Sequence, residues 1–514
     1  MNRFILYAMM GALPALAAVE FDAIYGDGMV LQRGREVQVR GTTDNPSEPV
    51  TVQFNGQKVK AEVKGKNWRA VLQPMEANAQ GQPLEASQKD SSAVVQNVVV
   101  GEVWIASGQS NMLWRLNQTP GNAQTIAQSA NDNFRFYHSE PQVHTSPPRY
   151  DAALLQRVQE KRMYEGKWAV SAPASSPRMS AVGYYFGQAL QKELGVPVGV
   201  IHASLGGSNM LAWIPRAMVK KEYPGCEGGD WVKSKYASAW VRGRAQQNVG
   251  PGGDFGLHPY APSYLYETGI EPWEGFPVAG VIWYQGESDA EILDNEQNKK
   301  LLKDLIISWR DKLGNEELPF LQVQLPRIND KSKLRAYWPE FRQVQAEVAE
   351  ELPAVGCVVT MDLGSTNSDV HPPRKVEVGE RLAATALSMV YGKEAAASGP
   401  VIQGFKAKGS KVQVSLDNAG GLKTTDGAAP VGFELAGNNK EFAPAAAEIK
   451  GDKIILTADA VKAPRYMRYG WAVFMEPNLV NEAGLPTAPY PASDGKTARK
   501  KDKKDARKDR KKRK

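Results

Sequence analysis

Apolar and polar residues alternate with a period of two in the first part of the chain, a pattern typical of β-strands. The alternation is clear in Val37-Gln38-Val39-Arg40 and in Val50-Thr51-Val52-Gln53-Phe54. Asn55-Gly56 then predicts a tight hairpin turn before the next strand, which contains Val59. Short strands separated by glycine-containing turns predict a small β-sandwich over residues 19–97.

From residue 98 to residue 395, apolar runs alternate with segments of helical spacing. The run Val98–Val100 continues after Gly101 to Ala106 with Glu102 as its only charge, which predicts a strand buried on both faces. Further strands are expected at Val198–Ile201, Val278–Tyr284, Phe320–Leu325 and Val355–Met361, and helices at Ala181–Leu194, Leu301–Leu313, Tyr337–Glu350 and Lys375–Met389. This alternation predicts an α/β domain with a parallel sheet.

Short β-type runs return after residue 396, at Val412–Leu416, Gly432–Leu435 and Lys453–Leu456, and predict a second β module. Residues 218–275 have weak periodicity and many Gly, Pro and Trp residues, so we expect loops or an insertion near the active face. The expected organisation is 1–18 signal peptide, 19–97 N-terminal β module, 98–395 α/β domain, 396–490 C-terminal β module and 491–514 basic tail.

The N-terminus has the pattern of a signal peptide. Arg3 precedes the apolar run Phe4–Leu13, which is too short to span a bilayer, and the small residues Ala15 and Ala17 follow. We therefore expect cleavage near Ala17 or Ala18 and a secreted or periplasmic protein.

The net charge of +7 on the 514 residues hides an uneven distribution. Residues 496–514 contain thirteen Lys or Arg and three Asp, a net charge of +10, so the rest of the chain carries about −3. We expect this tail to be disordered. It is either a solvated appendage or an electrostatic tether to anionic cell-envelope polymers or nucleic acid. No aromatic or structured segment accompanies its charge, which favours an appendage without a specific nucleic-acid partner.

Cys226 and Cys357 are the two cysteines. In an exported protein they could form a disulfide, but two unpaired thiols are an equal alternative. Neither has metal-ligand spacing.

Polar residues with catalytic potential follow three of the expected strands. They are Gly108–Met112, Ser204–Ser208 and Gln285–Asp289, and a fourth segment, Asp369–Pro372, precedes the last helix of the α/β domain. Ligands bind at the carboxyl ends of strands in open α/β sheets, so the four segments are expected to meet there. Each motif alone is more often a turn or a helix cap; their shared position favours an active site.

These segments together supply the groups of a serine hydrolase. Ser110 needs a base to remove its proton, and His371, after an acidic residue and before a helix, can be exposed and oriented. Asp369 could hold the other ring nitrogen of His371. Gly206 and Gly207 allow backbone N–H groups to approach an oxyanion, and Gln285 offers a side-chain amide.

Glu102–Met112 resembles the first conserved block of the sialate O-acetylesterase family, within the SGNH hydrolase superfamily. The similarity continues in Met29–Arg33, Ser180–Phe186, Trp283–Ser288, Asp369–Pro372 with Val378-Gly379, Arg468–Trp471, and Asn478-Leu479 with Gly484–Pro486. The similarity covers roughly residues 20–490, and sequence blocks of this length are specific to a family.

The resemblance implies a three-layer α/β/α SGNH hydrolase domain with a parallel sheet, flanked by β-sandwich-like modules. It implies removal of acetyl esters from sugar hydroxyls, typically on sialic acid, without a metal or organic cofactor. Carried over by position, Ser110 is the nucleophile and His371 the base. The oxyanion donors would be the Ser110 N–H, a glycine of the second block (Gly207 or Gly206) and Gln285.

Three positions depart from the family pattern. Leu205 replaces the usual Trp, which would reshape the wall that faces the sugar, and Asp289 replaces a frequent Asn. Ser368 occupies the usual position of the triad acid, three residues before the histidine, whereas Asp369 lies two before it. A Ser–His–Asp triad with Asp369 and a Ser–His dyad oriented by a backbone carbonyl both stay open.

The sequence hypothesis is a secreted carbohydrate O-acetylesterase that acts on O-acetylated sialic acids. The alternatives are an acetylesterase for another glycan such as acetylated xylan, a catalytically weak glycan-binding protein, and an envelope-attached structural protein. Substrate-binding residues and oligomeric state stay undetermined. Candidates for a substrate carboxylate are Arg115, Arg135, Arg178 and Arg327, and candidates for sugar stacking are Trp114, Trp213 and Trp273.

Overall fold

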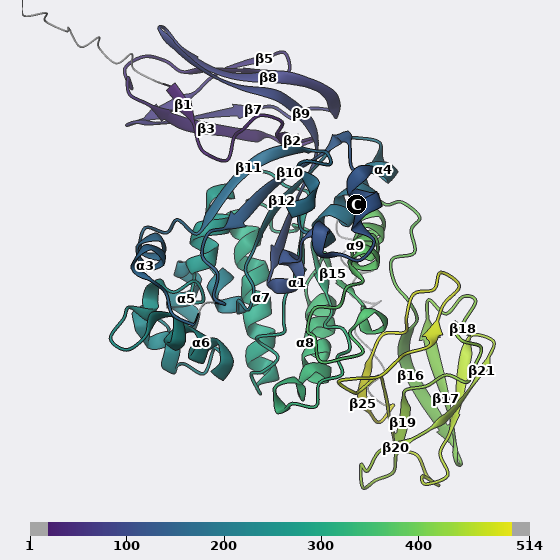
Figure 1. The fold of residues 1–514 in the computed structure, drawn as a ribbon. Helices are drawn as coiled ribbons and strands as arrows, with labels where there is room; N and C mark the ends of the chain where they lie inside the picture. The colour runs from purple at the N-terminus through teal and green to yellow at the C-terminus, as the bar shows by residue number, and fades with distance from the viewer. Residues whose placement is uncertain (1–18, 147, 496–514) are drawn as a thin grey trace, which may run out of the picture.

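The structure is a computed structural model that describes residues 19–146 and 148–495. The expected signal peptide, residues 1–18, and the basic tail from residue 496 lie outside the described residues. A β module, an α/β domain and a second β module follow one another along the chain, with the two β modules at opposite ends of the molecule (Figure 1).

The N-terminal module consists of two layers of antiparallel strands, as the alternating pattern predicts. One sheet has the order β1 (Val19–Phe21), β3 (Val37–Thr43), β7 (Asn67–Leu72) and β6 (Glu62–Lys64). The other contains β4 (Thr51–Phe54), β5 (Gln57–Lys60), β8 (Asn78–Gln88) and the first part of β9 (Ser91–Gly108). Strand β2 (Val30–Gln32) pairs with β9 in parallel, as the exception to the antiparallel pattern among the described strands of this module. The expected hairpin turn is confirmed: Phe54 lies opposite Gln57, and Asn55 and Gly56 have φ values of 49° and 77°.

Strand β9 (Ser91–Gly108) connects this module to the α/β domain without interruption. Its first part pairs with β8, and its last part lies between β12 and β13 of the central sheet. The expected boundary at residue 97 therefore falls inside one continuous strand, with Asn97 in a positive-φ conformation at that point.

The central sheet is mostly parallel, as predicted. Its order is β11 (Tyr164–Ser171), β10 (Asn131–Pro141), β12 (Val198–Ser204), β9, β13 (Gly280–Tyr284), β14 (Phe320–Val323) and β15 (Val355–Val358). Only the edge pair of β10 and β11 is antiparallel. The sequence did not predict this pair, because its strands carry charged residues at several positions.

Helices cover both faces of the sheet. Helices α4 (Ala181–Leu194) and α9 (Lys375–Met389) contact each other on one face, in the cluster that includes Trp104 and Ala106. On the other face, α7 (Asn295–Lys312) and α8 (Trp338–Glu351) pack with Ile105 and Trp283. Successive residues of a strand point to opposite faces, so the unbroken apolar run in β9 serves both layers.

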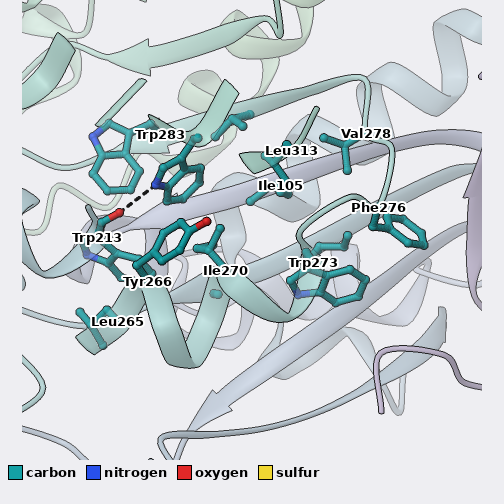
Figure 2. Packing of buried hydrophobic residues seen from close by; sticks show 14 of the residues in the cluster. Ile105, Trp213, Leu265, Tyr266, Ile270, Trp273, Phe276, Val278, Trp283 and Leu313 are labelled. Carbon is teal, nitrogen blue, oxygen red and sulfur yellow. Dashed lines mark hydrogen bonds between the residues drawn. The ribbon is translucent and has the colours of Figure 1, made fainter. Parts of the chain in front are cut away.

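Two of the tryptophans considered for sugar stacking lie in the core. Figure 2 shows Trp213 and Trp273 within a buried cluster with Trp283, Tyr266 and Ile270. Trp213 is fully buried, Trp273 is 2% exposed, and the indole of Trp309 donates a hydrogen bond to the Trp213 carbonyl at 2.8 Å. Neither indole can therefore contact a sugar.

Residues 218–275 contain more helix than the sequence predicted. This region holds most of α5 (Arg216–Glu222), all of α6 (Ala239–Val249), a π-helical turn at Tyr266–Ile270, and 3-10 turns at Gly228–Lys233, Phe255–Leu257 and Glu271–Trp273. The remaining helices are α1 (Ser110–Leu113), α2 (Asn122–Ala127) and α3 (Ala152–Gln159). None of the helices in the described ranges is long and apolar enough to span a membrane.

The C-terminal module is formed by antiparallel sheets. One sheet has the order β16 (Val401–Lys408), β17 (Lys411–Asp417), β22 (Lys453–Thr457) and β21 (Ala446–Lys450). Another has the order β20 (Ala443–Pro444), β19 (Phe433–Ala436), β23 (Tyr466–Tyr469) and β25 (Tyr490–Ser493). The short strands β18 (Lys423–Thr424) and β24 (Leu479–Val480) form a separate pair. Buried Arg342 of α8 ties this module to the α/β domain by donating hydrogen bonds to the carbonyls of Ala472 and Val473.

Cys226 and Cys357 are free thiols, so the unpaired alternative holds in this structure. Cys226 is buried, and its sulfur lies 3.1 Å from the Ser234 hydroxyl.

Candidate active site

The carboxyl ends of β9, β12 and β13 lie side by side because the three strands are parallel neighbours. Gly108 is in register with Ser204 on one side and with Tyr284 on the other. The segments that leave these ends, 108–112, 204–208 and 285–289, therefore meet at one edge of the sheet, as expected.

Ser110 is the first residue of α1, immediately after the tight turn that ends β9. Gly108 has a φ of 142°, and a Cβ there would lie 2.1 Å from the Tyr284 carbonyl oxygen, so this turn requires glycine. At the first helical position the Ser110 N–H has no acceptor within the helix. Among the described residues it donates to no other group, so it is available to a ligand.

The second segment places two glycines beside Ser110. A Cβ on Gly206 would lie 3.7 Å from the Ser110 Cβ, in ordinary contact. Gly207 has a φ of 72°, and a Cβ there would lie 2.2 Å from the Tyr260 hydroxyl and 2.6 Å from the Trp240 ring. Within the described part of the chain, the N–H groups of both glycines lack an acceptor, as an oxyanion hole requires.

His371 comes from the loop before α9 and lines the same pocket as Ser110. Its Nδ1 lies 3.1 Å from Asp369 Oδ1, which also accepts the His371 backbone N–H at 2.9 Å. The Trp114 ring stacks on the imidazole, with centroids 5.5 Å apart. Burial lowers the pKa of His371 and the negative charge of Asp369 opposes this, so the ring is neutral and able to accept a proton at neutral pH.

Gln285 does not face the pocket. Its side-chain Nε2 donates to the Ser208 carbonyl at 3.2 Å and to a carboxylate oxygen of Asp289, which uses both amide hydrogens. Asp289 is fully buried, and burial raises its pKa to about 7. The Gln285 amide, expected as the third oxyanion donor, therefore donates to Ser208 and Asp289 instead of to the pocket. Asp289 does not line the pocket.

The pocket around Ser110 has a volume of about 310 Å³, within the range of small-molecule sites. It is lined by Gln109, Ser110, Leu113, His144, Thr145, Ser146, Leu205, Gly206, Gly207, Trp240, Arg244, Tyr260, Glu287, Ser288, Glu291, Arg335, Val370 and His371. The pocket is therefore larger than an acetyl group requires, and it contains both acidic and basic side chains.

Comparisons with known proteins agree with this geometry. The model of the carbohydrate esterase family of sialic acid-specific acetylesterases matches residues 100–388, more than half of the chain. The chain belongs to this family. The matched residues include Ser110, Gly207 and His371.

Relatives of this sialic acid-specific acetylesterase family member are similar over much of its length. Human sialate O-acetylesterase is 27% identical over 413 residues, covering 73% of this chain and 71% of the human protein. Mouse sialate O-acetylesterase is 26% identical over 368 residues; the match spans 64% of each protein. A carbohydrate acetylesterase from Xanthomonas citri has a solved structure that is 30% identical, with a TM-score of 0.77, covering 93% of this chain and 99% of that one.

A buried polar network beneath the pocket was not predicted. Asn111 donates to a carboxylate oxygen of Glu287 and, at 2.9 Å, to the Val370 carbonyl, and it accepts from Lys375 Nζ. Burial raises the pKa of Glu287. Burial also lowers the pKa of Lys375 to about 7, although the negative charge of Glu287 opposes this decrease. The network connects helix α1, which begins at Ser110, to the residue before His371.

Residues that sequence analysis proposed for substrate contact lie elsewhere. Arg115 and Arg178 pair with Glu140, Arg135 donates to backbone carbonyls, and Arg327 donates to the carbonyls of Met361 and Asp362. Trp114 stacks on His371 but does not itself line the pocket. The pocket instead receives Trp240 and Arg244 from α6, whose weak periodicity gave no signal of a functional role.

Within the described ranges, no group of three or more His, Cys, Asp or Glu side chains could hold a metal ion.

Proposed function

We propose that this protein is a carbohydrate O-acetylesterase that removes acetyl esters from sialic acids, and that its central domain is an SGNH hydrolase domain. The observation that carries the proposal is the convergence of Ser110, His371 and two glycines with unbonded N–H groups on one pocket. Membership of the sialic acid-specific acetylesterase family supports the substrate. The names of the human and mouse relatives agree with it.

In the proposed mechanism His371 is the general base. With Nδ1–H donated to Asp369, its Nε2 carries the lone pair that accepts the Ser110 hydroxyl proton. Ser110 Oγ then forms a bond to the acetyl carbonyl carbon, and the carbonyl electron pair moves onto oxygen. The N–H groups of Ser110 and Gly207 donate hydrogen bonds to this oxyanion.

The intermediate collapses as the sugar oxygen leaves with the proton from His371, which leaves the acetyl group on Ser110. A water molecule then loses a proton to His371 and attacks the acetyl-enzyme. Breakdown of the second intermediate releases acetate and returns the proton to Ser110. No step requires a metal or an organic cofactor.

The proposal is tested by Ser110→Ala in an aryl-acetate assay and in an acetate-release assay on O-acetylated sialosides. We expect hydrolysis to fall by ~10³-fold or more, because the oxyanion donors alone leave little catalysis. Circular dichroism and thermal unfolding should match the parent protein. Ser47→Ala, in the N-terminal module, is the matched control. A folded and active Ser110→Ala protein would contradict the assignment of Ser110.

A second substrate class is supported by the similarity to the Xanthomonas citri carbohydrate acetylesterase, which extends over 93% of this chain. We infer that acetylated polysaccharides such as xylan are the main alternative to sialosides. Acetate release measured side by side on both substrate types distinguishes the two.

We also propose export through residues 1–18 and a secreted or periplasmic location, on the basis of the signal-peptide pattern. N-terminal sequencing of protein from the culture medium or periplasm should begin near Ala18 or Val19. Retention of Met1 in cell extracts would contradict export.

A further inference from the structure

Arg244 lines the Ser110 pocket from helix α6, and its side chain is partly exposed there. Within residues 19–146 and 148–495, no carboxylate oxygen lies within 4.0 Å of its guanidinium. The guanidinium carbon lies over the Trp240 ring, 5.7 Å from the ring centroid, in a cation–π contact. A guanidinium has five N–H donors in a planar fork, so this group presents unused donors to the pocket.

The other charged side chains of the pocket are compensated. Arg335 pairs with Glu291 at 3.1 Å and with Asp330 at 3.7 Å. Glu287 accepts from Asn111, which in turn accepts from Lys375. Arg244 is therefore the uncompensated cation of this pocket among the described residues, and it favours a ligand that brings a negative charge.

Packing holds Arg244 in place beside the proposed oxyanion hole. Trp240, one turn earlier on α6, lies beside both the guanidinium and Gly207, where a Cβ would lie 2.6 Å from the Trp240 ring. Tyr260 fixes the same region, since its hydroxyl donates to the Gly206 carbonyl at 2.7 Å. Burial raises the pKa of Tyr260, while a hydrogen bond from Thr145 and the positive charge of Arg244 oppose the rise.

We propose that Arg244 is a specificity-determining residue that binds the carboxylate of an acidic sugar while Ser110 attacks an acetyl ester on the same sugar. The inference rests on the proposed acetylesterase function and deepens it. A carboxylate fits the planar fork of a guanidinium with two parallel hydrogen bonds, whereas a neutral hydroxyl gains only one. Trp240 supplies the flat apolar surface that keeps the guanidinium oriented.

The test uses two substrates that differ only in charge: an O-acetylated methyl sialoside and the same compound with its carboxylate converted to a carboxamide. We expect the parent protein to favour the acid by ~10–100-fold in kcat/KM, the range for hydrogen bonds to a charged group. Arg244→Gln should remove this preference, by lowering kcat/KM for the acid far more than for the carboxamide. Arg244→Lys should restore part of the preference, because it keeps the charge without the fork.

Arg157→Gln is the matched control, because Arg157 lies on α3, outside the pocket, and pairs with Glu165. It should retain the full acid preference. An equal loss on the acid, the carboxamide and aryl acetate in Arg244→Gln would overturn the inference, and so would a parent protein without any acid preference.

Failure of the proposed function gives a different result. If the parent protein hydrolyses no acetyl ester, calorimetric titration with N-acetylneuraminate still tests Arg244. Binding that weakens at least tenfold in Arg244→Gln, and not in Arg157→Gln, supports the site. Binding that is absent or unchanged overturns it.

Discussion

At the scale of single residues, the contact between His371 and Asp369 decides between a triad and a dyad. Asp369 is 54% exposed at its side chain and accepts both the imidazole Nδ1–H and the His371 backbone N–H. A carboxylate so accessible to water stabilises an imidazolium less than a buried one does. We infer that Asp369 mainly orients the ring.

Asp369→Asn should therefore cost less than His371→Ala. We expect kcat to fall ~10-fold for the first change and ~10³-fold for the second, since only the second removes the base. Burial lowers the pKa of His371 and Asp369 opposes the shift, so the acidic limb of kcat/KM should have its midpoint below pH 6.5. Loss of the Asp369 charge should move that midpoint to a still lower pH. Equal losses in kcat would indicate a full triad, and a midpoint that rises in Asp369→Asn would contradict the electrostatic effect of Asp369 on His371.

At the scale of elements, the turn after β12 is shaped by packing against α6. Gly207 has a φ of 72° and is enclosed by Tyr260 and Trp240. Gly195, at the end of α4, has a φ of 68°, but a Cβ there would have nothing within 4 Å. The two glycines share a backbone conformation and differ in surroundings, so they form a matched pair.

Gly207→Ala should displace the oxyanion loop. We expect an aryl-acetate kcat ~10²-fold lower, as for loss of one oxyanion donor, and a destabilisation of ~2–4 kcal/mol from the combined backbone strain and overpacking. Gly195→Ala should cost only the strain, ~1–2 kcal/mol, and retain activity. Kinetics and denaturant unfolding of both variants provide the measurement. Equal effects of the two changes would exclude a packing role for Gly207.

The elements also show what local patterns can predict. The bounds of α4 and α9 agree with the expected helices because their apolar spacing and flanking residues are local signals. The strand ends that carry Ser110 and the two glycines were predicted for the same reason. By contrast, Gln285 points to Asp289, Trp213 is a core residue, and Arg244 reaches the pocket from an insertion. These three outcomes depend on contacts between distant segments, which no local pattern encodes.

At the scale of the whole molecule, two buried histidines make stability sensitive to acid. His202 lies in a chain of contacts from Ser204 Oγ (2.7 Å) through His138 Nδ1 (3.0 Å) to Glu140, which His138 contacts at 2.7 Å. Burial lowers the pKa of His202 well below its usual value and lowers that of His258 to about 3. Both rings therefore stay neutral in the native state at pH values where the same two histidines bind protons in the unfolded chain.

The free energy of unfolding should therefore fall as the pH drops below 6.5, by up to ~1.4 kcal/mol per pH unit for each of the two groups. Glu140 affects stability in a different pH range. Its pKa is lowered to about 2, mainly by the hydrogen bond from His138. Its contribution to the free energy of unfolding is therefore present above about pH 4.5 and is lost as the pH falls towards 2. A comparison of pH 7 with pH 5 consequently excludes the contribution of Glu140.

His258→Gln should reduce the difference in denaturant stability between pH 7 and pH 5, although it weakens the protein at pH 7 by disturbing the hydrogen bond from the Tyr260 N–H. His144→Gln, at an exposed position, is the matched control and should keep the difference of the parent protein. The comparison uses the difference between two pH values, so a general loss of stability in His258→Gln does not affect it. An equal pH dependence of stability in His258→Gln and in the parent protein would contradict a contribution from His258.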